Sequence, residues 1–131
     1  MRGTQTSGPE GESKLQNEAV LESLRADQEL EEMCRGADLA YFDGQYTHEE
    51  YFGRKPIGPT PAVSRVGWGH GCIEDILKRV TNTGIKHVLI GHHDPERSWP
   101  AQVAMDENLQ NFCAGKDFNV ELARDGHTIE L

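Results

Sequence analysis

The chain is poor in cysteine, in aromatic residues and in long apolar runs. Its three cysteines, Cys34, Cys72 and Cys113, form no Cys-x-x-Cys pair, so neither a disulfide framework nor a cysteine-rich zinc site is expected. No apolar stretch is long enough to span a membrane, the mean hydropathy is -0.65, and the first residues lack the apolar core of a secretion signal. We therefore expect a cytoplasmic, reduced protein in which each cysteine is a small buried hydrophobe.

The chain also lacks an excess of basic residues. Its 131 residues include 13 Lys and Arg against 22 Asp and Glu, which gives a formal net charge of -9. No cluster of Lys and Arg is interleaved with aromatic side chains, and an acidic surface repels a phosphate backbone. This composition argues against nucleic-acid binding and fits a single globular domain with one core.

We expect an α/β domain that follows a short tail. Residues 1–19 are rich in Gly, Ser, Thr, Gln and Glu, which predicts a disordered tail or linker. In residues 20–131 the apolar periodicity predicts helices at 25–35, 72–82 and 99–114, a brief helical turn at 47–53, and strands at 38–42, 86–91, 118–123 and 127–131.

The order of these elements predicts a mainly parallel sheet with flanking helices and a terminal hairpin. Strands that alternate with helices are joined by crossovers and run parallel. The last two strands flank the turn-forming pair Asp125-Gly126, and the residues expected to point inward are Val120, Leu122, Ile129 and Leu131. Polar residues that follow parallel strands should meet at one sheet edge, because the carboxyl ends of these strands lie together.

The most informative motif is the run Val88-Leu89-Ile90-Gly91-His92-His93-Asp94-Pro95. Here an apolar strand ends in two imidazoles and a carboxylate, groups that bind metal ions or transfer protons. Successive side chains of an extended backbone point to opposite sides, so we expect at most one of the two histidines to face a site. The alternative interpretation is an Asp-Pro turn with two solvated histidines.

Two further motifs place polar groups near the same edge. Asp43 follows a predicted strand in Phe42-Asp43-Gly44, and His70 lies between glycines just before a predicted helix. Flanking glycines allow a ligand to approach the backbone closely. Taken alone, the first motif is equally typical of an Asp-Gly turn and the second of a flexible loop with an incidental histidine. Their shared location with His92 favours a functional interpretation.

Three segments in order, GADLAYFDGQYTHEEY, GWGHGCIEDILKRV and GIKHVLIGHHDPERS, resemble the carboxyl-terminal part of metallo-β-lactamase-fold hydrolases. The nearest branch contains ribonuclease Z and related phosphodiesterases. The resemblance covers about residues 24–131 and implies that residues 20–131 are the carboxyl-terminal half of an αββα sandwich. It assigns Asp43 to the acidic motif, His70 to the loop histidine and His92 to the last metal-ligand position, with His93 and Asp94 as second choices for a ligand.

The resemblance implies a metal-dependent hydrolase that acts on a small phosphodiester or ester. The complete family site holds two ions, zinc or manganese, that activate a hydroxide. In this scheme His92 ligates one ion, while His70, oriented by Asp43, donates a proton to the leaving oxygen.

The departures from the family pattern are as informative as the match. The chain contains no His-x-His-x-Asp-His motif and no His-x-His, Gly71-Cys72 replaces the usual Ser-Thr, and Asp43 replaces Glu. One remaining ligand does not hold zinc, which takes three protein ligands in catalytic sites. We therefore expect a truncated or split enzyme that is inactive by itself.

Two alternatives to an enzyme remain open. In the first alternative, the chain is a non-catalytic partial domain that pairs with an amino-terminal half, another partner or a second copy of itself. The other alternative is a small metal-binding module that uses His70, His92, His93 and Asp94.

Overall fold

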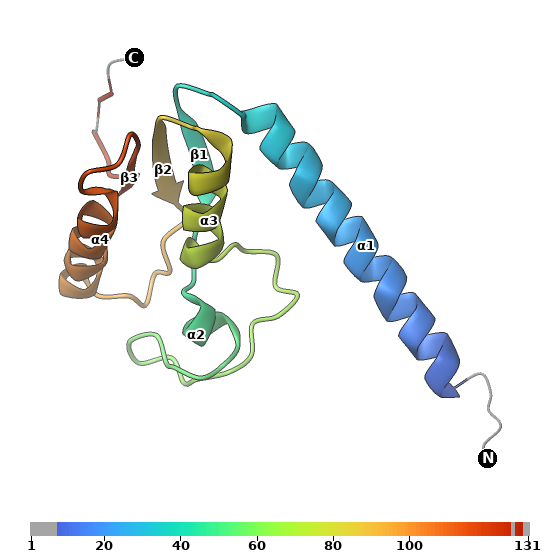
Figure 1. Cartoon of the computed structure of the whole chain (residues 1–131). Helices are drawn as coiled ribbons and strands as arrows, with labels where there is room; N and C mark the ends of the chain where they lie inside the picture. Colours follow the sequence, from blue (N-terminus) through green and yellow to red (C-terminus); the bar gives the residue numbers. More distant parts are fainter. Residues whose placement is uncertain (1–7, 127, 130–131) are drawn as a thin grey trace. The chain divides into compact units, whose positions relative to one another are not determined.

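The structure is a computed structural model that describes residues 8–126, 128 and 129. It divides into two compact units, residues 1–33 and residues 34–131. In chain order the elements are α1 (Gly8–Cys34), β1 (Ala40–Asp43), α2 (His48–Tyr51), α3 (Ile73–Thr83), β2 (His87–Gly91), α4 (Trp99–Cys113) and β3 (Asn119–Leu122) (Figure 1).

Residues 8–33 of helix α1 form the described part of the first unit, and the helix is 27 residues long and ends at Cys34. The sequence predicted its start near residue 25 and a disordered tail over residues 1–19. Residues 8–19 are helical instead, and residues 1–7 lie outside the described part of the chain. The helix-favouring Glu, Lys, Leu, Gln and Ala of this segment outweigh its Gly and Ser.

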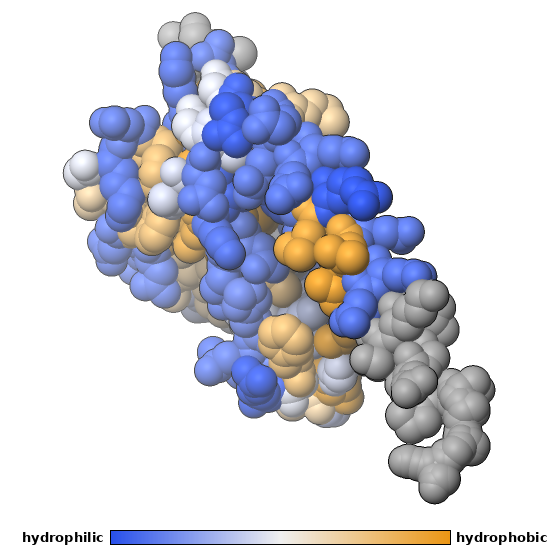
Figure 2. Space-filling model, turned by 45° about the vertical axis from the view of Figure 1, so that its right-hand side comes forward, coloured by the Kyte–Doolittle hydropathy of each residue, from blue (hydrophilic) through white to orange (hydrophobic). Residues whose placement is uncertain are grey.

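The apolar side chains of α1 are largely exposed. Val20, Leu21 and Leu24 have 57%, 58% and 53% of their surface accessible, and Met33 has 79%. The face of the molecule that Figure 2 shows is mostly hydrophilic, with separate apolar areas. None of the helices in the described residues is both long and apolar enough to cross a membrane.

The second unit is built on a parallel sheet with the strand order β1-β2-β3. In the register of the first pair, Ala40 lies beside Val88 and Asp43 lies beside Gly91. The parallel mixed α/β architecture that the sequence predicted is confirmed, and these strands lie within two residues of their expected bounds. The aligned ends of β1 and β2 place the residues that follow them at one edge of the sheet.

Helices α3 and α4 cover one face of this sheet. The core consists of apolar residues from the helices and from alternate positions of β2 and β3: Ile73, Ile76, Val80, Val88, Ile90, Leu109, Cys113, Val120 and Leu122, with Ile85 from the connecting loop. Gly84 ends α3 in the left-handed conformation, and Ser98 caps α4 by accepting a hydrogen bond from Ala101 N. Both helices therefore begin and end close to where their sequence signals predicted.

The opposite face of the sheet is less covered within this unit. Tyr41 on β1 is 62% exposed, and Leu89 and Glu121 on the neighbouring strands are only partly buried. The predicted terminal hairpin is not formed by the described residues, because Thr128 and Ile129 are not in a strand. The remaining residues of the expected last strand, 127, 130 and 131, lie outside the described part.

Candidate functional site

Asp43 and His70 form a hydrogen-bonded pair at the carboxyl edge of the sheet. Asp43 is the last residue of β1, and its Oδ2 accepts a hydrogen bond of 2.8 Å from Nδ1 of His70. Its other oxygen, Oδ1, accepts hydrogen bonds from the backbone N–H groups of Gln45 at 3.2 Å and Gly71 at 3.3 Å. Because the carboxylate accepts the Nδ1 proton, the pair selects the His70 tautomer whose Nε2 is left for other partners.

The surroundings of Asp43 favour its ionised form. Burial raises the pKa of the carboxyl, but the hydrogen bonds from His70, Gly71 and Gln45 outweigh burial and lower the pKa below its ordinary value of 3.8. Asp43 is therefore a carboxylate at neutral pH and a permanent acceptor for His70.

His92 completes the group directly after β2. Its ring stacks on the His70 ring, with the centroids 4.2 Å apart and an angle of 24° between the planes. Its Nδ1 lies 3.9 Å from Asp43 Oδ2. His92 is the one non-glycine residue with positive φ (57°) among the residues described. Such a conformation is uncommon for residues other than glycine and clusters at functional sites.

The two residues that follow His92, His93 and Asp94, form hydrogen bonds to other parts of the chain. His93 Nε2 donates a hydrogen bond of 2.9 Å to the carbonyl of Ala123. Asp94 is buried and accepts hydrogen bonds from Gln45 Nε2 at 2.9 Å and from Glu96 N at 3.0 Å. Of the two adjacent histidines only His92 joins the group with Asp43 and His70. His93 and Asp94, the second choices for a ligand, are held away from the group by these bonds.

Asp43, His70 and His92 therefore meet as the sequence predicted. One ligand atom from each lies within 4.8 Å of the others, and no further His, Cys, Asp or Glu of the described residues joins this group. One carboxylate oxygen and two imidazole nitrogens are the donor set that a single catalytic zinc takes from a protein. Counted together, the three groups match the needs of one ion and are too few for two, but His70 Nδ1 is already hydrogen-bonded to Asp43.

A second group that the sequence did not predict combines His48, Cys72 and Asp75. His48 Nε2 lies 2.9 Å from Asp75 Oδ1. Burial, followed by the charges of Asp75, Glu74 and Glu50, raises the pKa of the Cys72 thiol to about 12. The thiol is protonated at neutral pH, which makes this group the weaker metal candidate. Cys72 begins the apolar stripe of α3 in the sequence, so the pattern there indicated only burial.

A pocket of about 420 Å³ opens beside His70. Its walls include Gln45, Arg65, Trp68 and Asp94. His70 thus borders both the histidine–carboxylate group and a space large enough for a small organic group.

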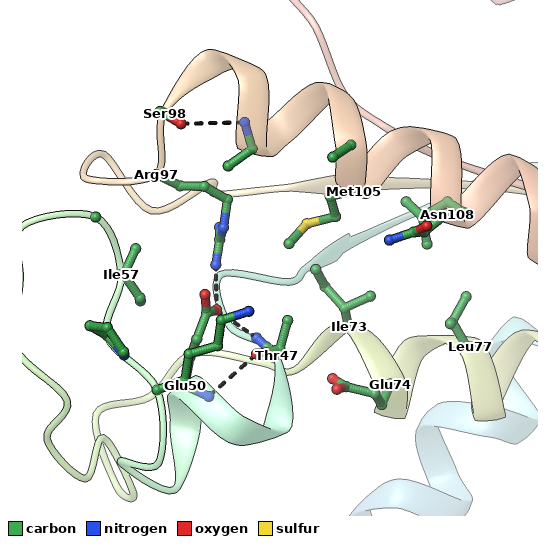
Figure 3. A pocket seen from close by; sticks show the side chains of 16 residues that line it. Thr47, Glu50, Ile57, Ile73, Glu74, Leu77, Arg97, Ser98, Met105 and Asn108 are labelled. Atoms are coloured by element: carbon green, nitrogen blue, oxygen red, sulfur yellow. Dashed lines mark hydrogen bonds and ion pairs between the residues drawn. The ribbon is translucent and has the colours of Figure 1, made fainter.

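A larger pocket of about 540 Å³ lies between α2, α3 and α4, and Figure 3 shows its side chains. A buried ion pair between Glu50 and Arg97 stands at one end of it (Figure 3). Glu50 is also the partner of Thr47 in the capping box that begins α2. None of Asp43, His70 and His92 lines this pocket, so its size alone does not make it the site of chemistry.

Comparison of the chain with family models, with curated proteins and with solved structures finds no match in any of the three.

Proposed function

We propose that Asp43, His70 and His92 belong to the active centre of a metal-dependent hydrolase of the metallo-β-lactamase type, which acts on a small phosphodiester or ester. The observation that carries the proposal is the meeting of the three residues at the carboxyl edge of a parallel sheet, with His70 bonded to Asp43 and stacked on His92. The order and spacing of the three motifs that resemble this family support it. The same proposal includes the fold expected for residues 20–131, the carboxyl-terminal half of an αββα sandwich.

The distances support a division of roles within the group. Two ligands of one tetrahedral zinc lie roughly 3.3 Å apart, given metal–ligand bonds of about 2.0–2.1 Å. The contact of 2.8 Å between His70 Nδ1 and Asp43 Oδ2 is shorter and is a hydrogen bond. His70 is then the proton donor to the leaving oxygen, oriented by Asp43, and His92 is the ligand.

A bound zinc or manganese ion would polarise the phosphoryl or carbonyl group and supply a hydroxide nucleophile. His92 would hold it, with Asp43 as the nearest carboxylate. The chain carries no His-x-His-x-Asp-His motif, and His92 with Asp43 falls short of the usual three ligands. By itself the chain should therefore bind zinc weakly and show no turnover.

Zinc titration by calorimetry, combined with hydrolysis of bis(4-nitrophenyl) phosphate, tests these roles. His92→Ala should abolish the weak zinc binding, whereas His70→Ala should leave it unchanged. When a polypeptide that carries the missing motif is added and turnover appears, His70→Ala should lower this turnover by about a hundredfold, the usual scale for a general acid. Metal content should stay the same.

His93→Ala is the matched control, because its imidazole bonds the Ala123 carbonyl and lies outside the group. It should change neither metal binding nor turnover. Loss of zinc in His70→Ala as complete as in His92→Ala would refute the division of roles. Zinc-dependent turnover by the chain alone that survives His92→Ala would refute the proposed centre.

The incompletely covered sheet face favours a second candidate, a non-catalytic domain that pairs with a partner chain. Tyr41 is 62% exposed at the centre of β1, an edge strand of the sheet. A contiguous exposed apolar surface on a sheet face marks an interaction site, and Leu89 on the neighbouring strand is also only partly buried. If this candidate holds, the chain self-associates or binds an added amino-terminal half, Tyr41→Ser weakens that association in light scattering, and zinc has no effect on it.

A further inference from the structure

We infer that the Gln45 side chain is a positioning residue, which places His92 against Asp43 by holding the loop after β2 to the loop after β1. Gln45 itself contacts neither substrate nor metal ion in this role. The inferred role rests on the proposed function in one respect, since His92 is the ligand there. The positioning itself is measurable in the metal-free chain.

The position of His92 is not explained by its own contacts. Its side chain is 53% exposed, against 29% for His70, and its Nδ1 lies 3.9 Å from Asp43 Oδ2, which is too long for a hydrogen bond. Its backbone is left-handed, with φ of 57°. A residue keeps such a conformation when the structure around it fixes the backbone on both sides.

Two hydrogen bonds flank His92 and fix its backbone in this way. On one side the Gly91 carbonyl accepts from Gly44 N at 3.1 Å, where the pairing of β1 with β2 ends. On the other side Asp94 Oδ2 accepts from Gln45 Nε2 at 2.9 Å, in a buried contact. His92 is therefore held between bonds to two consecutive residues of the loop after β1.

Gln45 also holds the other end of the Asp43–His92 contact. Its backbone N–H donates to Asp43 Oδ1 at 3.2 Å, and its carbonyl accepts from Arg97 NH2 at 3.0 Å. The residue is only 8% exposed. The same buried residue therefore orients the carboxylate through its backbone and holds the loop of His92 through its side chain.

Asp94 transmits the hold of Gln45 because it belongs to a tight turn. Its Oδ1 accepts from Glu96 N at 3.0 Å, and its carbonyl accepts from Arg97 N at 3.1 Å. Pro95 between them has a fixed φ. A bond to the Asp94 carboxylate therefore holds the whole turn, and with it the backbone of His92 two residues earlier.

Loss of the bond between Gln45 and Asp94 should affect one part of the site selectively. It leaves the buried Asp94 Oδ2 without its partner, which favours movement of the turn toward water. His92 then leaves the stack on His70, whose ring centres are 4.2 Å apart. The bond from His70 to Asp43 comes from the loop before α3 and should remain.

Nitrogen-edited imidazole spectra of the whole, metal-free chain test this role in Gln45→Met. Methionine has nearly the size of glutamine but no amide, so the substitution removes the bond without leaving a large cavity. The His92 ring signals should move to those of a solvated histidine, while the His70 Nδ1 signal, which reports the bond to Asp43, should stay. Zinc binding measured by calorimetry should weaken by about tenfold or more, the usual effect of losing a partner that orients a ligand.

Gln102→Met is the matched control. Gln102 also donates from its Nε2 to the loop after β2, to the Arg97 carbonyl at 3.2 Å, but it does so from α4 and has no bond to Gln45. The exchange is the same and removes an amide bond to the same loop. It should leave the His92 signals and the zinc affinity unchanged.

Substitutions of Asp94 test the same bond from its other partner. Asp94→Ala removes the bond and should displace the His92 signals as Gln45→Met does, which gives a second measurement if Gln45→Met does not fold. Asp94→Asn is the conservative variant. Its amide can donate to Gln45 Oε1, which has no hydrogen-bond partner among the described residues, and its oxygen still accepts from Glu96 N. Asp94→Asn should therefore keep the wild-type His92 signals.

Three outcomes would overturn the inferred role: unchanged His92 signals in folded Gln45→Met, simultaneous loss of the His70 Nδ1 signal, or equal damage in Asp94→Asn and Asp94→Ala. Displaced His92 signals together with no zinc binding by the wild type would leave Gln45 as the positioning residue and remove only the proposed function. Zinc binding that His92→Ala abolishes but Gln45→Met leaves intact would do the reverse.

Discussion

Asp43 Oδ2 and His70 Nδ1 lie 2.8 Å apart although 27 residues separate them along the chain. The last residue of β1 supplies the carboxylate, and the loop that leads into α3 supplies the imidazole. Gly71 ties the two elements together a second time, because its N–H donates to Asp43 Oδ1. The end of β1 and the loop before α3 therefore form the pair together. Its contribution to the free energy of unfolding can be measured by replacing Asp43.

Asp43→Asn should reduce the dependence of stability on pH in the acid range. The pKa of Asp43 in the folded chain lies below its ordinary value of 3.8: burial opposes ionisation, but the hydrogen bonds from His70, Gly71 and Gln45 overcome it. The carboxylate therefore stabilises the fold above the unfolded pKa, and this stabilisation is lost as the pH falls through the folded pKa. Urea unfolding at a series of pH values should show a gap between wild type and variant that shrinks below pH 3.8.

Asp38→Asn serves as the control for this measurement. Asp38 pairs with Lys86 at 3.3 Å, but both side chains are about two-thirds exposed (66% and 69%). Its replacement should change the free energy of unfolding by at most about 1 kcal/mol. A gap for Asp43→Asn that is independent of pH down to strongly acid conditions would show that the carboxylate is not held as described.

Arg97→Ala should be strongly destabilising. Arg97 and Glu50 form an ion pair in which the side chains are 5% and 7% exposed, and Arg97 also donates to the Gln45 carbonyl at 3.0 Å. Removing the guanidinium leaves a buried carboxylate without its cation, which costs roughly 3–5 kcal/mol in comparable pairs. Chemical denaturation of Arg97→Ala, Glu50→Ala and the double variant measures this coupling.

The double variant should lose less stability than the sum of the two single variants, because it leaves no unpaired charge. Strict additivity would mean that the pair is not coupled. The larger pocket, at whose end this pair stands, should change shape in the same variants.

Gly71→Ala should damage the site through the backbone. An added Cβ would lie 2.3 Å from the carbonyl oxygen of Asp43, which cannot rotate away. We expect a loss of about 1–3 kcal/mol, the usual cost of overpacking, together with a weaker His70–Asp43 bond. Gly91→Ala is the matched comparison, because its Cβ would meet the ring end of Tyr41, an exposed side chain that can move.

The cost of Gly91→Ala should therefore be smaller, and Tyr41→Ala in the same chain should remove it. The free energies of unfolding test whether Gly71→Ala loses more stability than Gly91→Ala. The imidazole signals of His70 in nitrogen-edited spectra test whether its bond to Asp43 is weakened. If Gly71→Ala proves as stable as the wild type with unchanged His70 signals, the loop approaches β1 less closely than the structure indicates.

Local patterns were sufficient to predict α3, α4 and β2 in the second unit of the chain. The apolar stripe of α3 and its terminating Gly84, the Ser98 cap of α4 and the apolar run of β2 act over a few residues, so they can be read without the tertiary structure. Parallel strands share a carboxyl edge, and this rule alone was enough to bring Asp43 and His92 together. The start of α1 is wrong in the sequence prediction, because the Gly and Ser of residues 8–19 indicate a tail while the helix-favouring residues around them form a helix from Gly8 onward.

Other features depended on contacts between distant parts of the chain. The sequence indicated that at most one of His92 and His93 faces a site, and the hydrogen bond of His93 to the Ala123 carbonyl and the left-handed backbone of His92 decide the direction of each ring. Among the described residues no hairpin follows β3, since Thr128 and Ile129 are not in a strand.

The sequence by itself determined the elements, their parallel order and the edge at which the three motif residues meet, because periodicity, caps and chain direction are local properties. Only the tertiary structure decided the partners of the buried polar groups. Gln45 and Asp94 are separated by 49 residues and Glu50 and Arg97 by 47, and no spacing rule connects such positions. A buried polar group must find a partner wherever packing brings one within about 3 Å, and that depends on the whole fold.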